Sequence, residues 1–342
     1  MFKNKKTIIG IIISVLFLVL IFHNVDLKEL VATFKQFNLK NILLIAGIYC
    51  LSMCIRACRW AFLLKCDKRY NFFKLLYAWV VGNLMNAFLP ARAGDIWRAY
   101  EIGATSQESK MKIFGSVMLE RILDGVSICT ILYLCVLMYA NLPWLRSMAN
   151  FSMLLFGGCL LAFYLIVHFN KVNEICNCLI SIGEKTPLKI RDTVGRVFSR
   201  ICSHVNLFVD GFEVLKHNYF SFMAVFFSFS VWFLECLITY YVITSFSMNC
   251  PISSAMFVVC FVALGTMIPS SSIFVGPYQY AFILALGLYH IDKSEALAVA
   301  LVHQSILMGA LLLFSLSLFV FNIFLNVKKT INASAETPDM LK

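Results

Sequence analysis

The stretch NLMNAFLPARAGDIWRAY, residues 83 to 100, interrupts an apolar segment with a proline, a glycine, an aspartate and two arginines. The rest of the chain largely avoids charge: 61% of its 342 residues are hydrophobic, 14% are charged, and 32 are phenylalanine. Such a composition cannot fold around one water-soluble core. The sequence therefore predicts an all-α polytopic membrane protein, and the interruption at residues 83 to 100 needs a physical explanation.

Six apolar windows are long enough, or nearly so, to cross about 30 Å of hydrocarbon as helices. They lie at about residues 7–23, 41–63, 113–139, 151–168, 219–246 and 294–324. Basic residues next to such spans favour the cytosolic side of a cell membrane. With the N-terminus inside, the cytosolic segments hold 21 of the 29 Lys and Arg residues, the opposite side holds 5, and three lie within spans. The bias predicts a multi-pass protein of the cell membrane with both termini in the cytosol.

This orientation predicts that residues 75–110 fold back on themselves. The basic segments before and at the end of this region both belong inside, and the apolar part, 75–89, is only about 22 Å long as a helix. A re-entrant hairpin with its turn at Pro90 to Gly94 satisfies both constraints. Residues 253–290 are also broken, at residues 269–272 and at Gly276-Pro277, and their flanks belong outside. They form either a second re-entrant hairpin or two short spans. If they form a hairpin, the two hairpins enter from opposite sides, and we take an inverted repeat as a hypothesis.

We expect one integral membrane domain over residues 1–330, followed by a short polar tail, 331–342. The basic loop 169–218 contains apolar residues at helical spacing and is predicted to be a cytosolic amphipathic helix on anionic lipid. The 13 cysteines lie mostly in spans or in that loop and are predicted to be free thiols. No metal-ligand spacing or cofactor motif is found, so no metal and no cofactor are expected.

Three charged residues in the third window, Glu120, Arg121 and Asp124, fall near the centre of the bilayer. Bare charges at that depth are costly, so these side chains must pair or face water. Glu120 and Asp124 share a helix face, and Arg121 reaches Asp124 at a spacing of three. They form either a structural ion network or the charged lining of a substrate cavity.

The broken segments supply further candidate substrate-binding residues. A half-helix that begins near Gly94 would present its positive N-terminal end to an anion, above all a phosphate. Arg92 and Arg98 would add a bidentate grip, or they only mark the cytosolic boundary. His303 and Gln304, in the last window, either line the cavity or are satisfied by packing. The remaining candidates are Asn83, Asn86, Pro90, Asp95, Ser270, Ser271, Gly276 and Gln279.

Three motifs resemble those of the lysylphosphatidylglycerol synthase membrane-domain family, also called flippase-like proteins. The opening stretch is similar to the pattern N-x-x-x-P-x-R-x-G-E-x-x-R, with Asp95 in place of the usual glutamate. MLERILD resembles E-R-x-x-D, and IPSSSIFVGPYQYA resembles P-x-x-P-G-x-x-G-x-x-E. The third motif departs from the family, because it has Ser272, Ile273 and Gln279 where Pro, Gly and Glu are usual. Gln304 stands where the last span often has Arg.

The resemblance implies lipid handling. Larger members of the family join such a domain, which moves a charged phospholipid between leaflets, to a soluble domain that aminoacylates phosphatidylglycerol. We expect a transporter for an anionic lipid, either a phospholipid or a polyprenyl-phosphate-linked molecule. A lipid-modifying transferase of the phosphatidylglycerol lysyltransferase type, alone or with a soluble subunit, and a membrane scaffold with structural ions are the alternatives. The partner is a membrane lipid and not a nucleic acid; a second copy of the chain or a soluble lipid-modifying enzyme also fits.

The hairpin at residues 75–110 predicts the side from which its turn is reached. A cysteine introduced as Ala93→Cys should react with a membrane-impermeant maleimide in inside-out vesicles, because the turn belongs to the cytosolic side. Labelling above the wild-type background in right-side-out vesicles, and only there, would exclude the hairpin.

Overall fold

A computed structural model describes residues 27–64, 70–89, 92–138, 143–169, 172, 174, 176–177, 188–266 and 276–335. Every regular element in these residues is a helix, which confirms the all-α prediction. The helices are α2 (Leu27–Gln36), α3 (Ile42–Leu64), α4 (Phe72–Phe88), α5 (Ala93–Ser106), α6 (Lys110–Met138), α7 (Pro143–His168), α9 (Leu188–Asp210), α10 (Asn218–Thr244), α11 (Ile252–Gly265), α12 (Pro277–Gly287) and α13 (Lys293–Ala335), with short 3-10 turns at Leu39–Asn41 and Glu213–Lys216.

Four helices of the described part are long and apolar enough to cross a membrane. They are α7, α10, α3 with its preceding turn, and α13 as far as Phe324, and they match four of the predicted windows. The window 113–139 lies in α6, which has 29 residues and carries the predicted intramembrane charges. The window 7–23 lies outside the described residues. Helix α7 begins at Pro143, earlier than its window, because polar residues near its start lower the hydropathy without breaking the helix.

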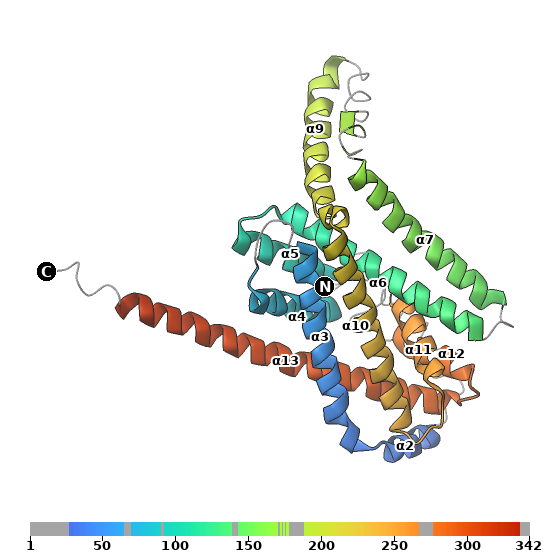
Figure 1. Cartoon of the computed structure of the whole chain (residues 1–342). Helices are drawn as coiled ribbons and strands as arrows, with labels where there is room; N and C mark the ends of the chain where they lie inside the picture. The colour runs from blue at the N-terminus through green and yellow to red at the C-terminus, as the bar shows by residue number, and fades with distance from the viewer. Residues whose placement is uncertain are drawn as a thin grey trace.

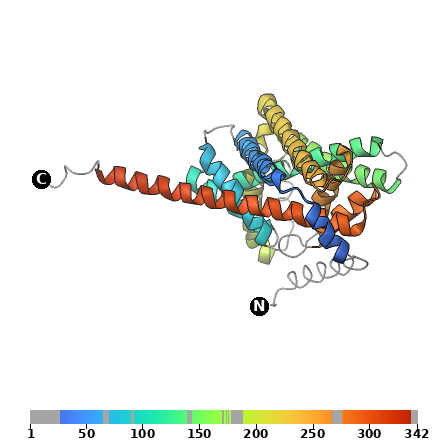
Figure 2. The ribbon, with the colours of Figure 1, turned by 90° about the horizontal axis from the view of Figure 1, so that it is seen from below.

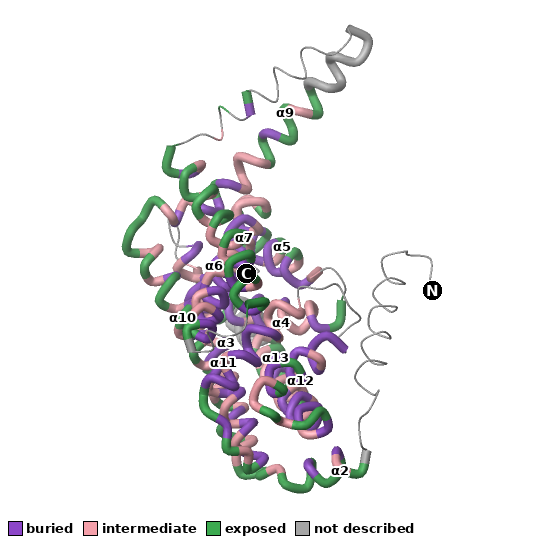
Figure 3. Tube along the Cα trace, turned by 90° about the vertical axis from the view of Figure 1, so that its right-hand side faces the viewer, coloured by how far each residue is buried: buried purple, intermediate pink, exposed green. Residues whose placement is uncertain are grey.

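The helices form a bundle from which two elements project. Helix α3 packs along α10, α6 packs along α7, and α13 contacts α2, α3, α4 and α12. The outer part of α9 projects away from the bundle, and the C-terminal half of α13 extends beyond it (Figures 1 and 2). Buried residues concentrate within the bundle, whereas much of α9 is exposed (Figure 3). This agrees with an amphipathic rather than a spanning α9.

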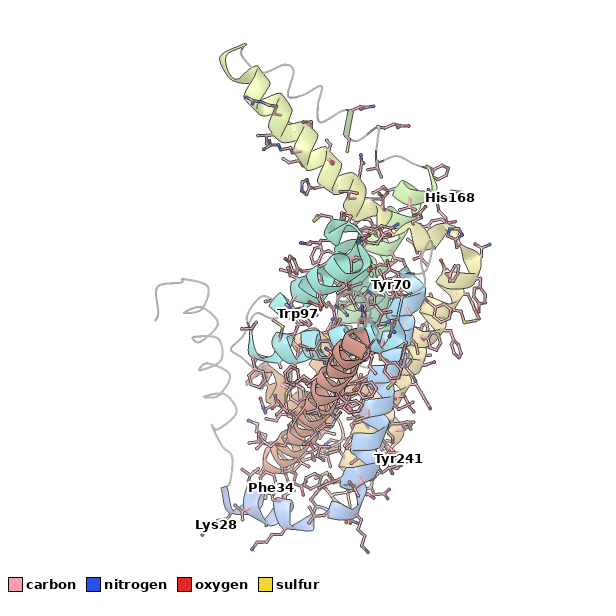
Figure 4. All side chains as sticks on the ribbon, turned by 90° about the vertical axis from the view of Figure 1, so that its left-hand side faces the viewer. Lys28, Phe34, Tyr70, Trp97, His168 and Tyr241 are labelled. Carbon is pink, nitrogen blue, oxygen red and sulfur yellow. The ribbon has the colours of Figure 1, made fainter. Side chains whose placement is uncertain are left out.

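The same helix–hairpin–helix order occurs twice, in opposite sense. In the described part of the chain, the buried apolar residues form two clusters, one around α4 and α5 and one around α11 and α12. Helix α3 runs from the second cluster to the first and α6 returns, whereas α10 runs from the first to the second and α13 returns. Figure 4 shows the two ends, with Lys28 and Phe34 at one and Tyr70 and His168 towards the other. The order is that of an inverted repeat.

The arms of the first hairpin approach each other closely at two glycines. A methyl group added to Gly94 would lie 1.8 Å from the carbonyl oxygen of Gly82 and 2.8 Å from Oδ1 of Asn86. Only glycine leaves room for this backbone contact. Asn86 then fastens the arms, because its Nδ2 donates to Asp95 Oδ1 at 3.0 Å and its Oδ1 accepts from the Asp95 N–H at 3.2 Å.

Gly94→Ala should therefore lower the thermal unfolding temperature in detergent, because an added methyl in a filled space costs about 1–3 kcal/mol. Gly158→Ala, in α7, is the matched control because no atom lies within 4 Å of its added methyl. The control should be neutral or stabilising, since alanine favours helix over glycine by about 1 kcal/mol. Equal unfolding temperatures for the two variants would contradict the close approach of the arms.

Candidate functional site

Arg59 of α3 lies at the centre of a buried ion network. Its side chain is fully buried, and its Nη1 donates to Asp124 Oδ1 at 2.5 Å while its Nη2 donates to Glu120 Oε1 at 2.9 Å. The Nη1 atom also lies 3.0 Å from the Ser228 hydroxyl of α10. Glu120 and Asp124 are one turn apart on α6, so one guanidinium can bind both. The network thus joins α3, α6 and α10.

The first hairpin contributes Asp95 and Arg98 to the same network. Arg98 Nη1 lies 3.0 Å from Glu120 Oε2, and Arg98 Nε lies 3.3 Å from Asp95 Oδ1. The Arg98 guanidinium also lies 5.0 Å from the ring centroid of Trp60. Its side chain is 1% exposed, so Arg98 is a buried member of the network rather than a marker of the cytosolic boundary.

Arg121 connects the network to open space. Its Nε and Nη2 donate to the two Asp95 oxygens at 3.2 and 3.0 Å, which is a bidentate pair, and its Nη1 lies 3.5 Å from Asp124 Oδ2. The contact with Asp124 is the one predicted from their spacing. The Arg121 side chain is 24% exposed, against 4% for Asp95. Arg121 therefore balances buried carboxylates while part of it faces a cavity.

Two adjoining cavities lie beside the network. The larger, of about 370 Å³, is lined by Asn83, Asn86, Arg92, Arg121 and Asp124, together with residues of α3, α10, α11 and α13. The smaller, of about 210 Å³, extends towards α11 and α12 and is lined by Glu235, Thr239, Tyr278 and His303 among others. Seven residues line both cavities, namely Tyr49, Arg56, Asn83, Arg121, Trp232, Ala263 and Thr266.

The structure separates the predicted site residues into groups. The cavities contain Asn83, Asn86, Arg92, Arg121, Asp124 and His303. Asp95, Arg98 and Glu120 lie in the ion network behind the cavity wall. Gly94 supports the hairpin, and Gly276, Gln279 and Gln304 form a separate group at the start of α12. Pro90, Ser270 and Ser271 lie outside the described residues.

His303 combines the two roles weighed for it. Its Nε2 lies 3.1 Å from the Thr239 hydroxyl and its Nδ1 lies 2.6 Å from the Tyr278 hydroxyl, so both ring nitrogens have partners. It also lines the smaller cavity. Gln304 instead accepts a hydrogen bond of 2.6 Å from Gln279, whose own Oε1 accepts from the Gly276 N–H at 2.8 Å. This chain of bonds links α12 to α13.

Sequence reasoning missed five residues of the site: Arg56, Arg59, Trp79, Trp232 and Glu235. The signal was present for three of them. Arg56 and Arg59 lie three apart in an apolar span, and Glu235 is the one acidic residue of window 219–246. An intramembrane charge indicates a buried partner. The two tryptophans gave no such signal, because tryptophan is common in membrane proteins.

The described residues show no cluster of His, Cys, Asp or Glu that could hold a metal ion. Their cysteines are all free thiols, as predicted for those positions. The network instead offers guanidinium groups, and these bind carboxylates and phosphates.

Fold and site together define a multi-pass helical membrane protein with an internal, charge-lined cavity. A family model described as the lysylphosphatidylglycerol synthase TM region matches residues 7–315, and the chain belongs to this family. It is 26% identical over 235 residues to a UPF0104 membrane protein of Methanocaldococcus jannaschii, a match that covers 69% of this chain and 92% of that protein. No solved structure matches the chain.

The network predicts a large stability cost for Arg59→Met. The substitution would leave Glu120 and Asp124 buried without their shared cation, and breaking a buried pair costs about 3–5 kcal/mol. Thermal unfolding in detergent measures the change. Lys112→Met is the control, because Lys112 lies 3.9 Å from Glu213 with both side chains partly exposed, and such surface pairs contribute at most about 1 kcal/mol. Similar losses for both variants would contradict the central role of Arg59.

Proposed function

We propose that this protein moves a lipid with a phosphate-bearing, anionic headgroup between the leaflets of the cell membrane. The lipid is a phospholipid or a polyprenyl-phosphate-linked molecule. The proposal rests on the family, which is that of the membrane region of lysylphosphatidylglycerol synthases, and on the chemistry of the larger cavity.

The observation that carries the proposal is the position of Arg92. This residue lies in the break between α4 and α5 with a left-handed backbone, at φ 51° and ψ 45°, which is uncommon for a residue other than glycine. It lines the larger cavity, and it makes no ion pair with any carboxylate of the described residues. A backbone strain of this kind is often retained at functional sites.

The charge balance of the cavity wall favours an anion. The larger cavity is lined by Arg56, Arg92 and Arg121 and by one carboxylate, that of Asp124. Asp124 is already bound by Arg59, and Arg121 is bound by Asp95. The guanidinium of Arg92 is therefore the group best placed to take a phosphate, and the amides of Asn83 and Asn86 line the same space.

The two helical hairpins are too short to cross the membrane, and they surround the cavities through which the headgroup would move. Helices α4, α5, α11 and α12 have 17, 14, 14 and 11 residues. At 1.5 Å per residue, none of them reaches about 30 Å. We place the α4–α5 hairpin as re-entrant from the cytosolic side and the α11–α12 hairpin from the opposite side. Irregular backbone at membrane depth is tolerated where it lines a wet cavity, and the cavities lie between these hairpins.

Lipid movement tests the proposal directly. Purified protein in phosphatidylcholine vesicles that contain fluorescently labelled phosphatidylglycerol should expose inner-leaflet probe to an external quencher faster than empty vesicles do. Arg92→Ala should slow this movement at least about tenfold, because a hydrogen bond to a charged group is worth roughly 1.5–3 kcal/mol.

Arg196→Ala, on the exposed part of α9, is the matched control because it removes the same charge outside both cavities. It should move lipid at the wild-type rate. Wild-type protein that moves the probe no faster than empty vesicles would exclude this lipid, and a fully active Arg92→Ala variant would exclude the assigned phosphate site.

A further inference from the structure

The boundary between the two cavities contains a second ion pair, Arg56 of α3 with Glu235 of α10. The Arg56 Nη2 atom lies 2.9 Å from Glu235 Oε1, and the Ser52 hydroxyl donates to the same oxygen at 3.1 Å. Arg56 lines both cavities, whereas Glu235 lines only the smaller and Arg92 only the larger. A headgroup that moves from one cavity to the other would pass the residues that line both, among them the cations Arg56 and Arg121.

Both members of this pair are partly exposed, and a single nitrogen holds them together. Its side chains are 11% and 13% exposed, whereas Arg59 and Glu120 are fully buried. Arg56 binds Glu235 through one nitrogen, and among the described residues it has no second ion pair. Arg121, by contrast, holds Asp95 with two nitrogens. Single bonds are weaker than bidentate ones, and both members of the Arg56–Glu235 pair line a cavity, so this is the pair that a competing anion can reach and exchange.

Arg56 keeps a fixed position without depending on Glu235. Its guanidinium carbon lies 5.6 Å from the ring centroid of Trp79 and 5.5 Å from that of Trp232, and such contacts stabilise a cation. The indole N–H groups are themselves anchored: Trp79 donates to Glu120 and Trp232 donates to Asp124, each at 3.1 Å. The ion network thus positions the two rings that hold Arg56.

We propose that Arg56 is a second anion-binding site between the cavities. Glu235 is its counterion when no phosphate is bound, and the phosphate of the headgroup displaces it. This inference rests on the proposed function. The phosphate binds first at Arg92 in the larger cavity and then replaces the Glu235 carboxylate on Arg56, while Trp79 and Trp232 keep the guanidinium in place. Departure of the phosphate restores the pair. Glu235 therefore lowers the affinity of the Arg56 site for anions and makes binding reversible.

The test measures binding of an anion rather than lipid movement, so that it can fail independently of the proposed function. Purified, delipidated full-length protein in neutral detergent is dialysed to equilibrium against radiolabelled inorganic phosphate. Glu235→Gln should bind phosphate about tenfold more tightly than wild type, because the competing carboxylate is removed while Gln can still accept from Ser52. In the Arg56→Gln background, the same Glu235→Gln substitution should give no gain.

The double-substitution cycle separates exchange at Arg56 from a general effect of charge. A gain that persists in the Arg56→Gln background would show that Glu235 acts on the whole cavity, and it would overturn the proposal. Unchanged phosphate binding by Glu235→Gln in the wild-type background would also overturn it. If Glu235→Gln unfolds in detergent, Ser52→Ala replaces it, because this variant loosens Glu235 without changing any charge. It should raise phosphate affinity about threefold, and unchanged affinity would overturn the proposal.

Discussion

The burial of Arg59 is the constraint on which the rest of the structure depends. A guanidinium fully removed from water in an apolar bundle must be neutralised by nearby carboxylates. Glu120 and Asp124 do this from one face of α6, and the same two carboxylates also bind Arg98, Arg121 and the indoles of Trp79 and Trp232. The position of the first hairpin against α3, α6 and α10 follows from these bonds. The same bonds position Arg121 and Asp124 in the wall of the larger cavity.

Gln279 and Gln304 form a neutral hydrogen-bonded pair between α12 and α13. By resemblance to the family, these positions would carry Glu and Arg, and each replacement alone removes a charge. In the structure the two side chains are bonded to each other at 2.6 Å. Two neutral amides that bond to each other leave no charge without a partner. Their bond links α12 to α13. The formal charge near the cavities lies instead with the ion network and with Arg56, Arg92 and Glu235.

Much of the fold was predictable because hydrophobic length and charge bias act locally along the chain. The segment at residues 75–110 contains two helices, α4 ending at Phe88 and α5 beginning at Ala93, and residues 253–290 contain two short helices. Glu120, Arg121 and Asp124 were found because charge within an apolar span is conspicuous. Their partners were harder to find: Arg59 lies 61 residues from Glu120 along the chain, and no spacing rule connects them. Trp79 and Trp232 were missed because a tryptophan's hydrogen bond is not visible in sequence.

By itself, the sequence determined the helical membrane class and the two broken elements, and it predicts an orientation, because each follows from the cost of placing charge or unpaired backbone in hydrocarbon. Only the tertiary structure decided which charges neutralise one another and which face open space. The sequence does not distinguish the roles of Arg98, Arg92 and Arg56. In the structure Arg98 is buried in the network, Arg92 lines the larger cavity, and Arg56 lines both cavities. The difference arises because the packing of distant helices, and not local spacing, sets the distance between a guanidinium and its carboxylate.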